Sequence, residues 1–204
     1  FTLAMSLRDP EFAEAYDTFM DSVVSSVGAK YKKASESEKI RVGVLHVRAP
    51  AGGMNAATRT ITRTCINKGH TVLGISNGFA GLIRGEVREL TWADQFSWQF
   101  KGGSDLGTSR AHPRPLSTMP EISPKGHGDF VDLGMIAFSL QRFNIQSLII
   151  IGGFEAFTSQ LVLTHARTYF PPFCIPMVQL PATVSNNVPG TDYSIGCDTA
   201  LNSI

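Results

Sequence analysis

The sequence predicts an α/β fold, a doubly wound, mostly parallel sheet with helices on both faces. Two short apolar runs, 40–47 and 145–151, are rich in β-branched residues and lack the polar alternation of a half-exposed strand. A glycine-containing loop and then apolar residues at helical spacing follow each run. Strands that are apolar throughout and separated by helices are typical of a parallel sheet buried on both faces.

The first 39 residues predict a helix and a connector. Asp9-Pro10 is a helix-start signal, and apolar residues then recur at helical spacing over 12–27. Residues 30–39 are polar and charged without apolar periodicity, as in a solvated linker. Because the chain starts at Phe1 rather than at a methionine, we expect it to be a segment of a larger protein.

A strand–helix–strand unit follows the connector. The apolar run 40–47 is its first strand, and a loop over 48–53 leads into a helix that Gly69 ends. Residues 70–76 predict the second strand, closed by a turn at Asn77-Gly78. The apolar stripe of the intervening helix consists of Met54, Ala57, Ile61 and Cys65.

A second unit begins after residues 79–129, which are rich in glycine and proline and predict no clear element. Two of its segments have apolar residues at helical spacing, and each is followed by a continuous apolar run typical of a buried strand. The predicted elements are a helix over 130–143, a strand over 145–151, a helix over 154–169 and a strand over 174–178.

Composition limits the classes of function. The chain has 204 residues, of which 43% are hydrophobic and 17% charged, so disorder is excluded and a sizeable core is possible. A net charge of +1 indicates no nucleic-acid partner, and no apolar run approaches the roughly 20 residues that span a membrane. Three widely spaced cysteines without a CxxC pair fit the reducing cytoplasm, where we expect the protein.

Three loops follow predicted strands, over 48–55, 152–157 and 181–192. Ligands of open parallel sheets bind beyond the carboxyl ends of the strands, so each loop is a candidate site. Gly52-Gly53 before a helix either approaches a phosphate or simply makes the turn. Glu155 is either a magnesium ligand or a favourable partner of the helix macrodipole. The third loop offers hydroxyls and amides but no carboxylate that could act as a general base.

Outside these loops, residues 102–110 join glycines and hydroxyls to Arg110, which is either a phosphate ligand or an ordinary surface arginine. The five histidines are scattered without ligand spacing and predict no metal site. Trp92 and Trp98 are more typical of core packing than of a binding platform.

Taken together, the motifs resemble those of 6-phosphofructokinase, and the residues before 40 resemble the end of the N-terminal half of the long, fungal-type subunit. This resemblance implies that 1–39 is the end of that half with its connector, and that 40–204 is the first part of the C-terminal half, truncated at its C-terminus. The stretches that carry the resemblance are LAMSLRDPEFAEAYDTF (3–19), APAGGMNAATR (49–59), GGSDLGTSR (102–110), LIIIGGFEAF (148–157) and PATVSNNVPGTDYSIGCDTALN (181–202).

The resemblance also implies that this half does not catalyse. The catalytic half of the family carries GGD, GGDGS and TIDND in its three loops, and the first loop here has lost its aspartate. Phe154 takes the place of the magnesium-binding aspartate, Ser185 that of the sugar-activating base, and Asn187 that of the second aspartate. Mg²⁺ and ATP would then act in the other half, and none is expected in this segment.

By the same resemblance, the lost sugar-phosphate site has become an effector site for fructose 2,6-bisphosphate. Removing carboxylates lessens the repulsion of a bisphosphate, and the new side chains add donors. The remaining phosphate ligands would lie beyond Ile204 or on another phosphofructokinase subunit. The residues implied to contact the effector are Arg110, Thr183, Val184, Ser185, Asn186 and Asn187.

Two alternatives stay open. This half is a divergent active kinase in which Glu155 replaces the metal ligand, or it is a structural half that supports only oligomerisation. An active half needs a base near Ser185, and the loop offers none.

Overall fold

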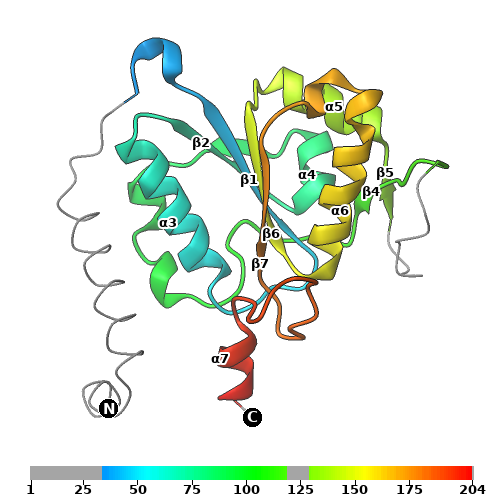
Figure 1. The fold of residues 1–204 in the computed structure, drawn as a ribbon. Helices are drawn as coiled ribbons and strands as arrows, with labels where there is room; N and C mark the ends of the chain where they lie inside the picture. The colour runs from blue at the N-terminus through cyan, green and yellow to red at the C-terminus, as the bar shows by residue number, and fades with distance from the viewer. Residues whose placement is uncertain (1–33, 119–128, 204) are drawn as a thin grey trace, which may run out of the picture. The chain divides into compact units, whose positions relative to one another are not determined.

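A computed structural model describes residues 34–118 and 129–203 (Figure 1). The predicted helix after Asp9 and residues 30–33 of the predicted connector lie outside these residues. The described end of the connector forms the short 3-10 turn η1 (Glu36–Glu38), which leads into the first strand.

Five strands form one sheet in the order β3-β2-β1-β6-β7. All neighbours pair in parallel except β3, which is antiparallel to β2. Val47 lies opposite Gly152, and Gly152 lies opposite Pro181, so three parallel strands end level at one edge of the sheet. The predicted mostly parallel sheet is confirmed. The strands are β1 (Arg41–Val47), β2 (Thr71–Ile75), β3 (Val87–Glu89), β6 (Ser147–Gly152) and β7 (Met177–Pro181).

Helices cover both faces of this sheet, as predicted. Figure 1 shows α3 (Met54–Asn67) on one side and α4 (Gly78–Arg84), α5 (Leu133–Arg142) and α6 (Phe154–His165) on the other. Side chains alternate along a strand, so each face has its own core cluster. In β1, for example, Val42 and Val44 belong to the cluster with Met54 of α3, whereas Leu45 and Val47 belong to the other.

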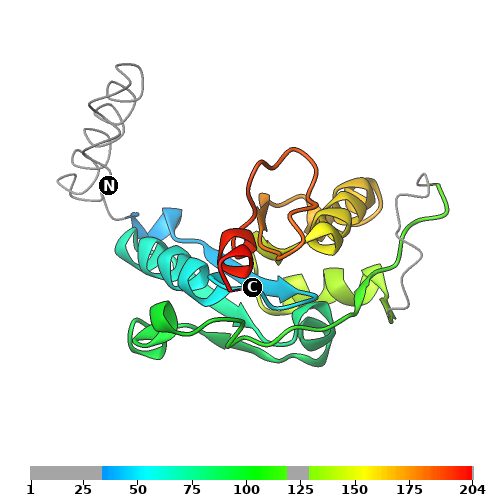
Figure 2. The same cartoon turned by 90° about the horizontal axis from the view of Figure 1, so that it is seen from below.

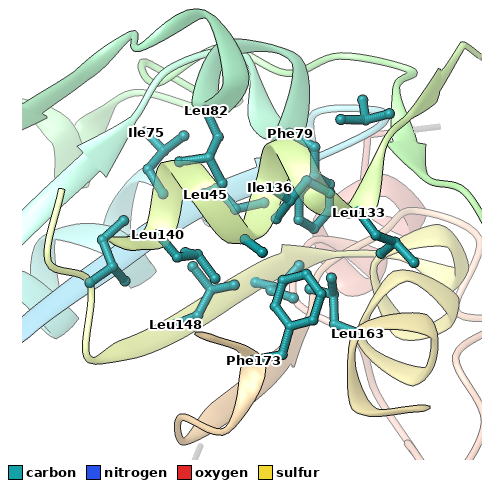
Figure 3. Packing of buried hydrophobic residues seen from close by; sticks show 14 of the residues in the cluster. Leu45, Ile75, Phe79, Leu82, Leu133, Ile136, Leu140, Leu148, Leu163 and Phe173 are labelled. Atoms are coloured by element: carbon teal, nitrogen blue, oxygen red, sulfur yellow. The ribbon is translucent and has the colours of Figure 1, made fainter. Parts of the chain in front are cut away.

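The larger cluster lies beneath α4, α5 and α6 (Figure 3). Its largest fully buried members include Phe79 of α4, Leu140 of α5 and Phe173 of the 3-10 turn η5 (Pro171–Phe173). Each such side chain contributes about 1.5–3 kcal/mol through removal of its apolar surface from water. This packing keeps the strand ends, and the loops that follow them, in fixed positions.

The segment that predicted no clear element contains a helix. Ser76 and Asn77 form a turn after β2, as predicted, and Asn77 also starts α4, with Asn77 at φ +55° and Gly78 at φ +59°. Asparagine and glycine tolerate the left-handed conformation that such an abrupt start requires. The rest of the segment forms the 3-10 turns η2 (Ala93–Gln95) and η3 (Trp98–Phe100) and the strand β4 (His112–Pro113).

Several further boundaries differ from the predictions; α6, for example, ends at His165 rather than at 169. The helix predicted over 130–143 begins only at Leu133, because the Asp132 side chain caps it by accepting a hydrogen bond from the Met135 N–H at 3.1 Å. Phe130 instead belongs to β5 (Phe130–Val131), which pairs with β4. Phe130 is therefore not part of the helical core stripe.

The last predicted strand starts later than expected, at Met177 rather than at 174. The Arg167 guanidinium donates hydrogen bonds to the carbonyls of Phe173 and Ile175, at 3.0 and 2.9 Å. Because these carbonyls are bound to Arg167, this part of the chain does not pair with the sheet. Arg167 itself lies in the 3-10 turn η4 (Ala166–Thr168), which follows α6. The final helix is α7 (Cys197–Leu201), preceded by Gly196 at φ +91°.

The two tryptophans have different surroundings. Trp98 is 4% exposed and belongs to the cluster beneath α3, as predicted. Trp92 is 45% exposed, so the prediction that it packs in the core is wrong. The guanidinium of Arg63 lies 4.3 Å from the centre of its ring, a cation–π contact on the surface of α3.

His46 is a buried histidine that ties residues 102–110 to the sheet. Its Nδ1 lies 2.6 Å from the Ser104 hydroxyl, and its Nε2 lies 2.7 Å from the Thr58 hydroxyl. Burial lowers the pKa of His46 from 6.5 to about 4, because the charged imidazolium would lose its hydration. In the folded chain, His46 is therefore neutral at pH 7.

The lowered pKa of His46 predicts a loss of stability on acidification. Between pH 6.5 and 4 the unfolded chain binds a proton at this residue and the folded chain does not. The stability that comes from neutral His46 is therefore complete above pH 6.5 and is lost as the pH falls to 4. We expect the free energy of unfolding to fall by about 3 kcal/mol more in the parent than in His46→Gln. Urea denaturation at pH 7 and pH 4 measures the difference.

The exposed His165 provides the control for this measurement. His165→Gln should keep the pH dependence of the parent. Equal pH dependence in the parent and in His46→Gln would contradict a buried neutral imidazole.

Candidate functional site

A pocket of about 170 Å³ lies where β1, β6 and β7 end. The loops after these strands come together at the lower edge of the sheet in Figure 1, and Figure 2 views this edge from below. Each of the three strands is followed by residues that line the pocket, as expected for a parallel sheet. The lining residues are Arg48, Ala49, Gly153, Glu155, Thr183, Ser185 and Asn187.

The charged groups of the pocket are Arg48 and Glu155. Arg48 Nε lies 3.3 Å from Glu155 Oε1, and the two side chains are 29% and 27% exposed. The Arg48 N–H donates to the Ser109 carbonyl at 3.2 Å, which joins the first loop to residues 102–110. Glu155 is in the first turn of α6, and its carboxylate is an ion-pair partner rather than a free metal ligand.

The loop after β7 is closed at its base and braced inside. The Thr183 N–H donates to the Ile195 carbonyl at 2.9 Å, beside a bridge between Ala182 and Ile195. Asn186, at φ +49°, donates from Nδ2 to the Asp192 carbonyl and accepts at Oδ1 from the Ser194 N–H, at 2.9 and 2.8 Å. The loop is therefore preorganised, with Asn186 as its internal brace.

Of the predicted effector contacts, the structure brings Thr183, Ser185 and Asn187 together in the pocket. The other three do not line it. Val184 is 53% exposed, the Asn186 amide is engaged inside the loop, and Arg110 is an exposed neighbour of Ser109. The roles of all six residues toward an effector stay predictions.

The loop glycines permit close packing, and of Gly52, Gly53 and Gly153 only Gly153 also lines the pocket. A Cβ at Gly153 would lie 3.1 Å from the Thr183 Cβ, so glycine lets the second loop approach the third. A Cβ at Gly53, where φ is +91°, would lie 2.7 Å from the Ile195 Cγ2. Neither Gly52 nor Gly53 lines the pocket, which favours the turn over phosphate contact.

Arg48 is the pocket residue that the sequence did not single out. Its position after the first strand is the available signal, but a loop arginine is usually solvated. The pocket and the partner on α6 become visible only in the folded chain.

The donor set of the pocket fits an anion. Arginine, hydroxyl and amide groups donate hydrogen bonds, and Phe154 is not among the residues that line the pocket. The Phe154 ring lies 6.3 Å from that of Phe157. Within residues 34–118 and 129–203, no three or more histidine, cysteine, aspartate or glutamate side chains gather as a metal cluster.

None of the helices in the described part of the chain is both long and apolar enough to cross a bilayer.

Comparison with known proteins identifies the family. The chain is 43% identical over 204 residues to ATP-dependent 6-phosphofructokinase subunit alpha of Candida albicans and 44% identical over 205 residues to subunit beta of Saccharomyces cerevisiae. Both alignments cover the whole chain but only 19% and 20% of those proteins, so the chain spans about a fifth of their length.

Solved structures and a family model agree with these relatives. The crystal structure of Pichia pastoris phosphofructokinase in the T-state matches with a TM-score of 0.76 and 45% identity, over 99% of this chain and 20% of that one. The family model described as phosphofructokinase matches residues 41–204. The chain therefore belongs to the phosphofructokinase family.

Proposed function

We propose that the chain is a segment of a fungal-type, cytoplasmic ATP-dependent 6-phosphofructokinase subunit. The whole enzyme would transfer a phosphoryl group from ATP to fructose 6-phosphate, giving fructose 1,6-bisphosphate and ADP in glycolysis. Residues 1–39 would end the N-terminal half and form the connector, and 40–204 would begin the C-terminal half. The similarity over the whole chain to fungal subunits of this name supports the proposal.

Within this enzyme, the segment would be regulatory rather than catalytic. Its pocket would bind fructose 2,6-bisphosphate as an allosteric effector, while Mg²⁺ and ATP act in the other half. The observation that carries this proposal is the donor set of Arg48, Ser185 and Asn187 in a pocket whose carboxylate is already paired. Phosphate groups accept hydrogen bonds from all three side-chain types.

Assembly with other phosphofructokinase subunits is part of the proposal. The relatives are named as alpha and beta subunits, and this chain is similar to both kinds. Such a neighbouring subunit would be able to contribute part of the proposed effector site.

Substitution of Arg110, which does not line the pocket, tests whether the effector site extends beyond it as the sequence predicts. In the full-length enzyme, Arg110→Ala should raise the activation constant for fructose 2,6-bisphosphate about ten- to a hundredfold, because a charge-assisted hydrogen bond contributes about 1.5–3 kcal/mol. Activity measured against effector concentration gives this constant. Arg142→Ala, which changes an exposed arginine in the last turn of α5, is the matched control.

Two outcomes would contradict these assignments. An unchanged activation curve would make Arg110 an ordinary surface arginine. If the parent enzyme neither binds nor responds to the effector, the regulatory site is wrong, and the structural half that supports only oligomerisation becomes the better explanation.

A further inference from the structure

Arg48 has a backbone conformation that arginine rarely adopts. Its φ is +70°, in the left-handed region. The other non-glycine residues with positive φ in the described part of the chain are Asn77, Asn144 and Asn186. Asparagine tolerates this region because its short side chain can hydrogen-bond locally, whereas a long side chain carries the full steric cost. Arg48 is therefore the strained exception.

The strain places the arginine side chain in the pocket. The Arg48 N–H is held by the Ser109 carbonyl at 3.2 Å, and its Nε is held by Glu155 at 3.3 Å. The guanidinium lines the pocket together with Ser185 and Asn187. Its two terminal nitrogens make no hydrogen bond to any residue in 34–118 or 129–203, so the N–H donors on both stay available.

Stability alone does not explain this arrangement. An ion pair whose partners are more than a quarter exposed adds little to stability, because solvent screens it and both side chains lose freedom. A left-handed arginine costs more than such a pair contributes. A glycine at position 48 would adopt the left-handed conformation without this free-energy cost. Strained residues of this kind gather where a side chain contacts a ligand.

We propose that Arg48 is the principal phosphate-binding residue of the pocket, donating from its terminal nitrogens to the phosphoryl group that Ser185 and Asn187 also contact. This inference rests on the proposed effector site and adds a residue that the sequence motifs did not include. A guanidinium matches two phosphate oxygens at once, which a lysine ammonium cannot do.

Glu155 has a positioning role in this arrangement. Its carboxylate forms an ion pair with Nε at 3.3 Å and so holds the Arg48 side chain at the pocket, which residues of the third loop also line. The same negative charge repels a phosphate. Affinity for the ligand is therefore held below what the arginine alone would provide.

Arg48→Gly is the decisive variant, because it removes the guanidinium and relieves the strain together. In the full-length enzyme its melting temperature should equal or exceed that of the parent, while the dissociation constant for fructose 2,6-bisphosphate rises about ten- to a hundredfold. Calorimetric titration and thermal unfolding measure the two effects. Arg48→Lys, which keeps the charge but not the fork, should give an intermediate rise of about three- to tenfold.

Two other variants complete the test. Glu155→Gln keeps the size and polarity of the side chain but loses the negative charge, so it should bind the bisphosphate about three- to tenfold more tightly. Arg84→Ala breaks a comparable pair outside the pocket, where Arg84 Nε lies 2.7 Å from Glu86 Oε1. This control should bind as the parent does.

The outcomes separate this inference from the proposed function. If the parent binds fructose 2,6-bisphosphate and Arg48→Gly binds it equally well, the role of Arg48 is wrong and the effector site stands. If the parent does not bind the bisphosphate, the proposed effector is wrong, and pyrophosphate becomes the probe. Pyrophosphate binding that Arg48→Gly loses would support the anion site, and binding of neither probe would overturn both.

Discussion

A full-length subunit whose N-terminal half is inactivated at its catalytic aspartate should show no 6-phosphofructokinase turnover above background. We expect this because the half proposed to contain this chain would lack two requirements of the reaction. A positioned general base contributes about 10²–10⁴-fold in rate, and Ser185 and Asn187 cannot serve as one. A magnesium-bound phosphoryl donor needs carboxylate ligands, yet the Phe154 side chain is apolar and Glu155 is paired with Arg48.

Release of ADP in a coupled assay measures this turnover. Glu155→Gln in the same inactivated background is the control for the divergent-kinase alternative, because Glu155 is the pocket's carboxylate. Turnover that is present in the inactivated subunit and disappears with Glu155→Gln would assign catalysis to this half and contradict the regulatory role.

The buried parts of the fold could be predicted from the sequence. Both β1 and β6 are covered by helices on their two faces, so their residues had to be apolar throughout, and that run is visible without a structure. The start of α4 could not be predicted in the same way. An Asn-Gly pair is a turn signal, and only the packing of Phe79 and Leu82 against the sheet makes the following residues helical.

The candidate site was only partly predictable for a related reason. The loop over 183–187 stands out by its resemblance to a catalytic loop without its carboxylates. Asn186 and Asn187 are the same residue type, and the hydrogen bonds of Asn186 to Asp192 and Ser194 decide which of them reaches the pocket. Arg48 stands out because of its positive φ and its ion pair with Glu155, and neither can be seen in the local sequence.

Restoring both carboxylates of the third loop should abolish the response to fructose 2,6-bisphosphate. Ser185→Asp with Asn187→Asp places about two negative charges beside a phosphorylated ligand, and each pair of unit charges some 4 Å apart costs about 4 kcal/mol at an effective dielectric near 20. The new carboxylates would also compete with the ligand for Arg48, which lines the same pocket. We therefore expect an enzyme that turns over but does not respond to the effector.

Calorimetry and an activation assay on the same double variant test this expectation, with Ser185→Ala plus Asn187→Ala as the uncharged control. The control loses two donors without gaining repulsion, so its affinity should fall by only about 0.5–1.5 kcal/mol per lost hydrogen bond. Coupling between two sites requires an effector that binds the two quaternary states differently, so an effector that no longer binds cannot shift them. Binding and activation equal to the parent in the charged variant would mean that the loop does not face the ligand. The regulatory site would then lie elsewhere in the subunit.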